Sequence, residues 1–181
     1  PCKAVTVWSD TLAAEDCGDE AADWFSSVLG IRCRLVRLPQ NSQRQVDLRY
    51  ADPGRWVSFA DGFPVLVATE SSLAALSDCI GRPLAIERFR PNIVVSGVGA
   101  FAERRWQALE HKDGLLDIRK PCQRCVIPTR NMETLEREGD VMDALKALCR
   151  IDGKIIFGQN ALVSGLQRLC VGDELTERFS D

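Results

Sequence analysis

Short apolar runs rich in β-branched residues outnumber helical segments along this chain, and that imbalance most constrains its fold. Their composition and alternation are typical of strands, and they lie at residues 4–8, 31–36, 65–68, 92–95, 113–120, 154–163 and 167–177. Apolar residues repeat at helical spacing only at 19–30, 71–81 and 139–150. About seven or eight strands that do not alternate regularly with three short helices predict an α+β fold, with a barrel-like curved sheet and helices packed outside.

Charge and length exclude several classes of protein. The chain has 181 residues, a formal net charge of −3 and no basic run, so a nucleic-acid partner is not expected. No apolar stretch approaches the roughly 20 residues that a membrane-spanning helix needs. The eight cysteines are scattered, which favours reduced thiols in a cytoplasmic, reducing compartment. We expect a single domain over residues 1–181, and the start at Pro1 without an initiator Met suggests a fragment.

A C-x-x-C pair in "KPCQRCVIP", made by Cys122 and Cys125, allows several kinds of site. A structural zinc site needs four ligands, and the sequence has only His111 and no second C-x-x-C. A thioredoxin-like pair opens a helix, whereas residues 126–127 favour a strand and Pro128 blocks helix-interior geometry. Packing of both cysteines as small apolar residues stays open as a third possibility.

A polar cluster, "ERFRPNIVVSG", leads into an apolar strand upstream of the pair. Pro91 predicts extended backbone at Arg90, and alternation then places Arg88, Arg90 and Asn92 on one side of the chain. A planar guanidinium and an amide that both donates and accepts suit an anionic or heterocyclic ligand. The alternative is a solvated strand edge with two surface arginines.

Two further segments combine turn or polar residues with apolar strands. In "FADGFP", the Asp61-Gly62 turn can expose backbone N–H groups to an anion, although a simple hairpin turn explains it as well. In "FGQN", Gln159 and Asn160 interrupt an apolar strand, as polar groups aimed into a site or as an irregular strand end. No nucleophile elbow, P-loop or G-x-G-x-x-G is present, so any catalysis is expected to belong to a bound cofactor.

Taken in order, "SFADGFPVLVATESSL", "FRPNIVVSG", "PCQRC", "FGQN" and "VGDEL" resemble the MOSC family, named for the molybdenum cofactor sulfurase C-terminal domain. The likeness runs from about Val5 to Leu175 and is closest to the amidoxime-reducing branch. It implies a β-barrel-like core of MOSC type that binds molybdenum cofactor (Mo-molybdopterin). It also implies that relatives have an N-terminal β-rich module, which nothing in this chain matches.

The resemblance assigns roles to individual residues. Cys125 would be the protein's metal ligand and the catalytic residue, with Cys122 as a neighbour that does not bind metal. A soft thiolate is a sensible ligand for such a metal. The cofactor contacts implied by the resemblance are Gly62, Phe63, Arg90, Asn92, Arg124, Gln159 and Asn160.

The implied activity is reduction of N-hydroxylated compounds such as amidoximes and hydroxylamines. Two electrons would come from an external donor such as a ferredoxin, a flavin reductase or a cytochrome b5-like protein. The alternative is a molybdenum cofactor carrier or a sulfurase C-terminal domain without redox catalysis of its own. Residues 126–150 lack the D-P-x-T-G turn of relatives, which bears on the substrate pocket more than on the metal site.

Overall fold

The computed structural model describes residues 2–179, and the chain divides into two compact units. The first spans Pro1–Gly62 and the second spans Phe63–Asp181. Since two compact units can belong to one folding domain, the expectation of a single domain stays a prediction. Each unit is described by itself below.

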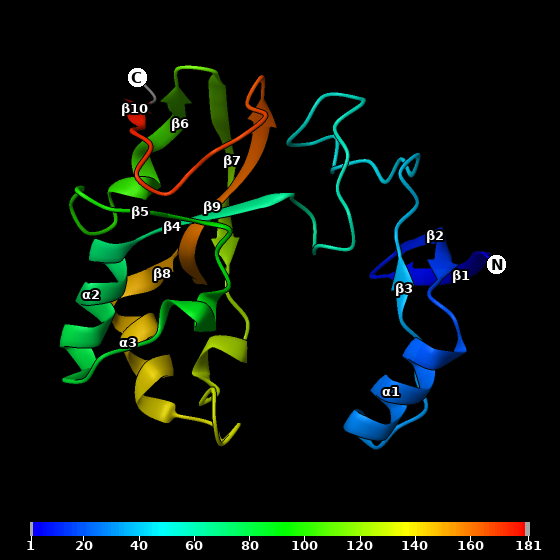
Figure 1. The fold of residues 1–181 in the computed structure, drawn as a ribbon. Helices are drawn as coiled ribbons and strands as arrows, with labels where there is room; N and C mark the ends of the chain where they lie inside the picture. Colours follow the sequence, from blue (N-terminus) through cyan, green and yellow to red (C-terminus); the bar gives the residue numbers. More distant parts are fainter. Residues whose placement is uncertain (1, 180–181) are drawn as a thin grey trace. The chain divides into compact units, whose positions relative to one another are not determined.

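The first unit is a small sheet with one helix (Figure 1). Strands β1 (Cys2–Val7) and β2 (Asp10–Asp16) form an antiparallel hairpin, and β3 (Val36–Arg37) pairs with β2. Helix α1 (Asp19–Leu29) confirms the helix predicted there and ends at Gly30 in a left-handed conformation.

The strand predicted over residues 31–36 is wrong except at its end, because this segment folds back on α1. The Ser26 hydroxyl of α1 accepts a hydrogen bond from the Cys33 N–H at 3.0 Å and lies 3.2 Å from the Cys33 carbonyl, to which it donates. These contacts occupy backbone groups that a sheet would need. The alternation of apolar and polar residues at 31–36 therefore did not indicate strand pairing.

The second unit contains a seven-stranded mixed sheet within residues 63–179, and it curls into a half-barrel (Figure 1). Only β4 and β5 run parallel, and the other paired strands are antiparallel. This arrangement confirms the predicted α+β, barrel-like fold. The order across the sheet is β10 (Thr176–Phe179), β6 (Trp106–His111), β7 (Gly114–Gln123), β9 (Lys154–Ser164), β4 (Val65–Thr69) and β5 (Ile93–Val95), with β8 (Arg150–Ile151) pairing with β9.

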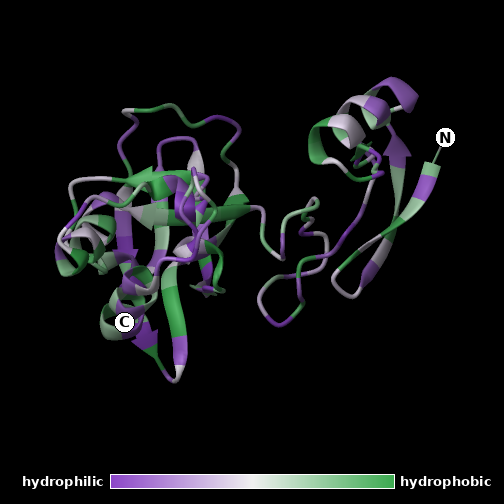
Figure 2. Cartoon of the chain, turned by 90° about the horizontal axis from the view of Figure 1, so that it is seen from below, coloured by the Kyte–Doolittle hydropathy of each residue, from purple (hydrophilic) through white to green (hydrophobic). Residues whose placement is uncertain are grey.

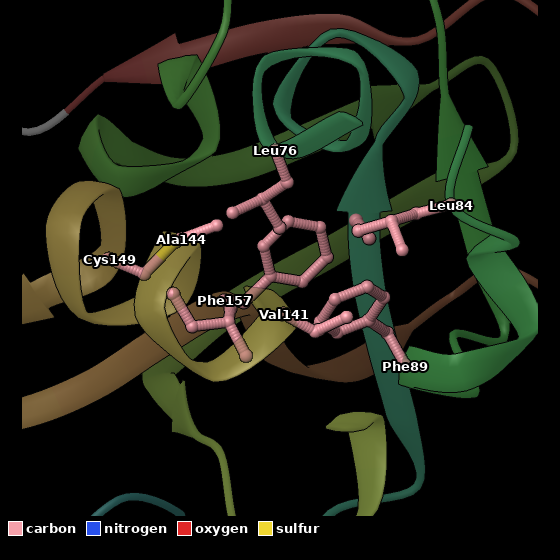
Figure 3. Packing of buried hydrophobic residues seen from close by; sticks show 9 residues of the cluster. Leu76, Leu84, Phe89, Val141, Ala144, Cys149 and Phe157 are labelled. Atoms are coloured by element: carbon pink, nitrogen blue, oxygen red, sulfur yellow. The ribbon is translucent and has the colours of Figure 1, made fainter. Parts of the chain in front are cut away.

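Helices α2 (Glu70–Ile80) and α3 (Gly139–Cys149) confirm two predicted helices and pack beside each other against the sheet (Figure 1). Their apolar faces join Phe89 and Phe157 in one buried cluster (Figure 3). Phe89 belongs to a short 3-10 helix, η1 (Ile86–Phe89). This cluster therefore connects both helices to the turn that precedes Arg90.

A second cluster of buried apolar residues includes Val67, Trp106 and Leu116. Strand β6, which contributes Trp106, was missed by the sequence patterns because its C-terminal part reads as a charged stretch. Residues 167–177 do not form the predicted strand, and only Thr176 onward pairs in the sheet. Hydrophobic and hydrophilic residues are interspersed along the strands of both units (Figure 2).

None of the helices formed by residues 2–179 has the length and apolar character needed to cross a membrane. The longest helices have 11 residues, or about 16 Å at 1.5 Å per residue. That is about half the thickness of a bilayer's hydrocarbon core.

Candidate functional site

Two of the predicted polar residues lie in one row across the middle of the second unit's sheet. Asn92, just before β5, donates its backbone N–H to the Leu66 carbonyl at 2.9 Å and accepts the Leu66 N–H on its side-chain oxygen at 2.8 Å. Leu66 pairs with Asn160 of β9, which in turn pairs with Lys120 of β7. The row thus places Asn92 and Asn160, which are far apart in the sequence, on the two sides of β4.

The adjacent row holds Gln159, which pairs with Val67 on one side and Pro121 on the other. Three residues of β9 oppose two of β7 here, which is a β-bulge. Gly158 sits in the bulge with φ +78°, and a Cβ built on it would lie 2.7 Å from the Val67 carbonyl oxygen. The bulge lets Phe157 and Gln159, two positions apart, join different faces of the sheet.

Gln159 is the most buried polar member of the predicted set. Its side chain belongs to a residue only 3% exposed, and within residues 2–179 its amide makes no hydrogen bond. The bulge shows that the strand is irregular at "FGQN". The predicted contact of Gln159 and Asn160 with a cofactor stays a prediction.

The predicted extended backbone at Arg90 is wrong. Arg90 adopts a left-handed conformation, with φ 53° and ψ 45°, and its N–H donates to the Glu87 carbonyl at 3.0 Å, closing η1. The expectation that Arg88, Arg90 and Asn92 share one side of an extended chain is wrong for the same reason. Arg88 is buried, whereas Arg90 is exposed and its side chain has no partner among the described residues.

The Arg124 side chain makes two contacts within the protein. Its Nη2 donates to the Phe89 carbonyl at 2.8 Å, and its Nη1 lies 3.2 Å from the Cys122 sulfur. Its backbone N–H continues the β7–β9 pairing by donating to the Ile155 carbonyl at 2.8 Å. Its Nε is buried and has no hydrogen-bond partner among the described residues.

Cys125 follows β7 directly and is an exposed free thiol. Its sulfur accepts the Ile127 N–H at 3.5 Å. The strand expected at residues 126–127 is wrong, because Val126 has helical backbone and a 3-10 turn, η3 (Ile127–Thr129), follows. Pro128 is compatible with this geometry because it lies in the first turn, where no N–H is needed.

Gly62 and Phe63 lie where the two units meet in the chain, since Gly62 ends the first unit and Phe63 begins the second. No side chain or backbone atom lies within 4 Å of a Cβ built on Gly62. The predicted contact of these two residues with a cofactor stays a prediction.

The donor set gathered here fits a cofactor that brings its own sulfur ligands. Across residues 2–179, no three His, Cys, Asp or Glu side chains gather closely enough to hold a metal ion. What the second unit offers instead is one exposed thiol at Cys125, a cation at Arg90 whose side chain has no partner among the described residues, the Arg124 guanidinium and the Gln159 amide. A single thiolate with cationic and amide donors suits an anionic, metal-bearing organic cofactor.

A groove runs along the edge strand β5 and begins at Asn92. It has a volume of about 910 Å³ and is lined by residues 92–98, 169–177 and Glu70. A volume of this size admits a small organic molecule. Asn92 therefore connects the polar rows of the sheet to a space that can hold a ligand.

Sequence patterns missed one pair that assembles the site. The rings of Phe89 and Phe157 stack with centroids 4.0 Å apart and planes at 30° (Figure 3). Phe89 immediately precedes Arg90, and Phe157 lies two residues before Gln159. The signal that could have revealed the pair is a Phe at the start of both "FRPN" and "FGQN".

Curated relatives cover most of this chain. Mitochondrial amidoxime-reducing component 1 of Mus musculus is 33% identical over 176 residues, which are 90% of this chain and 52% of that protein. Mitochondrial amidoxime reducing component 2 of Bos taurus is 33% identical over 183 residues, covering 92% and 54%. Molybdenum cofactor sulfurase of Homo sapiens is 27% identical over 177 residues, covering 88% and 20%. The chain thus spans about half the length of the first two relatives.

The family comparison agrees with these relatives. The description "MOSC domain" matches residues 54–176, which include every residue of the predicted site. The match covers more than half of the chain and confirms the resemblance derived from the motifs. This chain therefore belongs to the MOSC domain family.

Proposed function

We propose that this chain is the molybdenum cofactor-binding domain of a reductase that acts on N-hydroxylated compounds such as amidoximes and hydroxylamines. The observation that carries the proposal is the exposed Cys125 thiol beside Arg124, on the same unit as Arg90, Asn92 and the Gln159–Asn160 pair. Relatives named amidoxime-reducing components support the reaction class.

Each residue of the site has a separate task in this proposal. Cys125 would hold the metal through its sulfur, and the Ile127 N–H, 3.5 Å from that sulfur, would orient it. Arg90 and the Arg124 Nε would bind the anionic part of the cofactor, and the Gln159 amide would bind a heteroatom of its ring system. When bound, the cofactor would supply two-electron redox chemistry, as cofactors do for chemistry that side chains cannot perform.

Partners and location follow from the same proposal. The substrate would be a small N-hydroxylated molecule. Electrons would come from a ferredoxin, a flavin reductase or a cytochrome b5-like protein, in a reducing compartment such as the cytoplasm. The likeness to a molybdenum cofactor sulfurase favours one alternative, a domain that binds the cofactor for delivery.

Substitution of the two cysteines tests the metal assignment. We expect Cys125→Ser to lose at least about nine-tenths of the bound molybdenum, because a serine hydroxyl is a poor soft-metal ligand. Cys122→Ser is the matched control and should retain most of it. Metal analysis of protein purified from cells that make the cofactor gives the answer, and full molybdenum retention in Cys125→Ser would disprove the assignment.

Benzamidoxime turnover then separates the two functions. Cofactor-loaded protein supplied with a chemical or protein electron donor should form benzamidine if the chain is a reductase. Loaded protein that binds molybdenum through Cys125 yet forms no benzamidine would favour the delivery alternative.

A further inference from the structure

Segments on both sides of Cys125 are held by the same short turn, η1. On the N-terminal side, Arg124 donates to the carbonyl of Phe89, the last residue of η1, at 2.8 Å. On the C-terminal side, Arg88 of η1 reaches the segment that follows Cys125. The thiol therefore lies between two attachments to one turn.

The C-terminal attachment depends on a single nitrogen of Arg88. Its Nη1 lies 2.7 Å from the Arg130 carbonyl, 3.4 Å from the Pro128 carbonyl and 2.7 Å from a carboxylate oxygen of Glu138. The Arg88 side chain is 6% exposed, so these interactions are poorly screened by water. Both carbonyls belong to residues within five positions of Cys125.

The turn itself is firmly anchored in the core. Phe89 is fully buried and stacks on Phe157 of β9, while the Arg90 N–H closes the turn on the Glu87 carbonyl. A rigid anchor can transmit its own position to whatever it holds. Cys125 has no such anchor, because it is exposed and lies outside any strand.

We propose that η1 acts as a two-sided clamp on the Cys125 segment, with Arg88 and Arg124 as positioning residues for the Cys125 thiol. Arg88 is the informative member, since it is not among the residues expected to contact a cofactor. The value of the clamp for a metal-binding thiol rests on the function proposed above. The clamp itself is a property of the protein and can be measured without cofactor.

Hydrogen exchange in Arg88→Met measures the clamp directly. The Thr129 and Arg130 amides are hydrogen-bonded within η3, to the carbonyls of Val126 and Ile127. Loss of a charge-assisted hydrogen bond to the adjacent carbonyls should speed exchange in a peptide covering 124–131 by about tenfold or more. Exchange in a peptide covering 141–149, in the core of α3, should change by less than about twofold.

Two control variants separate positioning from general destabilisation. Arg88→Lys should restore most of the protection, because one ammonium can donate to the carbonyls and pair with Glu138 as one guanidinium nitrogen does. Arg82→Met removes another arginine, 3.2 Å from Glu138, whose ion pairs among the described residues are with Glu138 and Asp140 and not with the Cys125 segment. It should leave exchange at 124–131 unchanged.

The results that would overturn the clamp are specific. Unchanged exchange at 124–131 in Arg88→Met would overturn the clamp. An equal rise in exchange at 124–131 and 141–149 would also overturn it, because such a rise indicates that the whole protein has become less stable. If Arg88→Met does not fold, Glu138→Gln keeps the arginine and its carbonyl contacts, and its exchange at 124–131 should rise by less than about tenfold. A full tenfold rise in Glu138→Gln would assign the effect to the ion pair and reject the carbonyl contacts as the clamp.

Molybdenum content of the loaded Arg88→Met variant extends the test to function. If the clamp positions a metal thiolate, the variant should retain less molybdenum than Arg88→Lys. Faster exchange with normal molybdenum content would leave the clamp standing and reject its role in metal binding. Loss of molybdenum from Cys125→Ser is a separate result, so the two proposals fail independently.

Discussion

At the scale of single residues, backbone conformation matters as much as side-chain chemistry. Gly158 has φ +78°, and its Cα faces the Val67 carbonyl so closely that no Cβ fits. Arg90 adopts a left-handed conformation although it is not a glycine, which strains the backbone at the point where an exposed cation is presented. Arg90 lies in "FRPN" and Gly158 lies in "FGQN", two motifs that predicted a site from their side chains alone.

Gly158→Ala should destabilise the protein more than the same change at Gly153. Gly153 has a similar φ of +76°, but no atom lies within 4 Å of its Cβ position. Left-handed strain costs about 1–2 kcal/mol at both sites, and the clash with a backbone carbonyl adds to it only at Gly158. Urea unfolding should show at least about 1 kcal/mol more loss for Gly158→Ala, and equal losses would mean that β9 shifts to accommodate the methyl group.

At the scale of single elements, the start of α2 depends on a buried polar cluster. Thr69 is the N-cap residue and accepts the Ser72 N–H at 3.2 Å. The Ser72 hydroxyl lies 2.8 Å from one carboxylate oxygen of Glu103, and the Thr69 hydroxyl lies 3.2 Å from the other. A buried carboxylate at a helix N-terminus is stabilised by these hydrogen bonds and by the helix dipole.

Glu103→Gln should cost about 1–3 kcal/mol of unfolding free energy. A glutamine amide has one oxygen and one NH2 group, so it cannot accept a hydrogen bond at each of the two positions where Glu103 accepts from Thr69 and Ser72. Glu110→Gln is the matched control. Glu110 forms an exposed ion pair with Arg178, and its loss should cost less than about 1 kcal/mol. Thermal or urea unfolding checks the pair, and similar losses for both variants would show that the buried cluster adds nothing.

At the scale of the whole molecule, apolar burial is unevenly distributed. Both large apolar clusters lie in the second unit, whereas the buried apolar residues among positions 2–62 are the small side chains Ala14, Ala22, Val46, Ala51 and Val57. The first unit relies more on ion pairs between charged side chains. One of them joins Arg34 Nε to a carboxylate oxygen of Asp16 at 2.6 Å, and the Asp16 side chain is 1% exposed. Acid should therefore weaken the first unit before the second.

The sign of this pH effect follows from Asp16. The hydrogen bond from Arg34, with one from the Gly18 N–H, holds the pKa of Asp16 well below its ordinary value of 3.8. A lowered pKa gives stability that is fully present above the ordinary value and is lost as the pH falls toward the folded-state pKa. Protonation in the unfolded state therefore favours unfolding from about pH 4 downward.

Asp16→Asn should weaken the hairpin at pH 7 and reduce its further loss of stability in acid. Hydrogen exchange of peptides from β1 and β2 checks this, with the difference between wild type and variant narrowing as the pH falls from about 4 to about 2. Asp23→Asn is the control, since Asp23 lies on the same unit and has no ion pair among the described residues. An unchanged difference between wild type and Asp16→Asn from pH 7 to pH 2 would contradict the assignment.

Local patterns along the chain predicted its three α-helices and the strands β1, β4, β5, β7 and β9, but they missed β2, β6 and β8. Helical spacing and terminal glycines located α1 and α2, because these signals act within one turn of the chain. The joint occurrence of Arg90, Asn92, Arg124 and Cys125 in their motifs identified the family and predicts the site residues. Strand β6 was missed because a charged stretch becomes buried only when neighbouring strands flank it.

Only the tertiary structure decided how those residues work together. It turned Arg88 inward and Arg90 outward, because η1 closes a helical turn where an extended chain was expected. It placed Gln159 between Val67 of β4 and Pro121 of β7, next to a bulge in the β7–β9 pairing, and it attached Arg124 to Phe89 across 35 residues. Contacts between distant segments depend on packing that no local pattern contains, so the clamp around Cys125 is visible only in the folded chain.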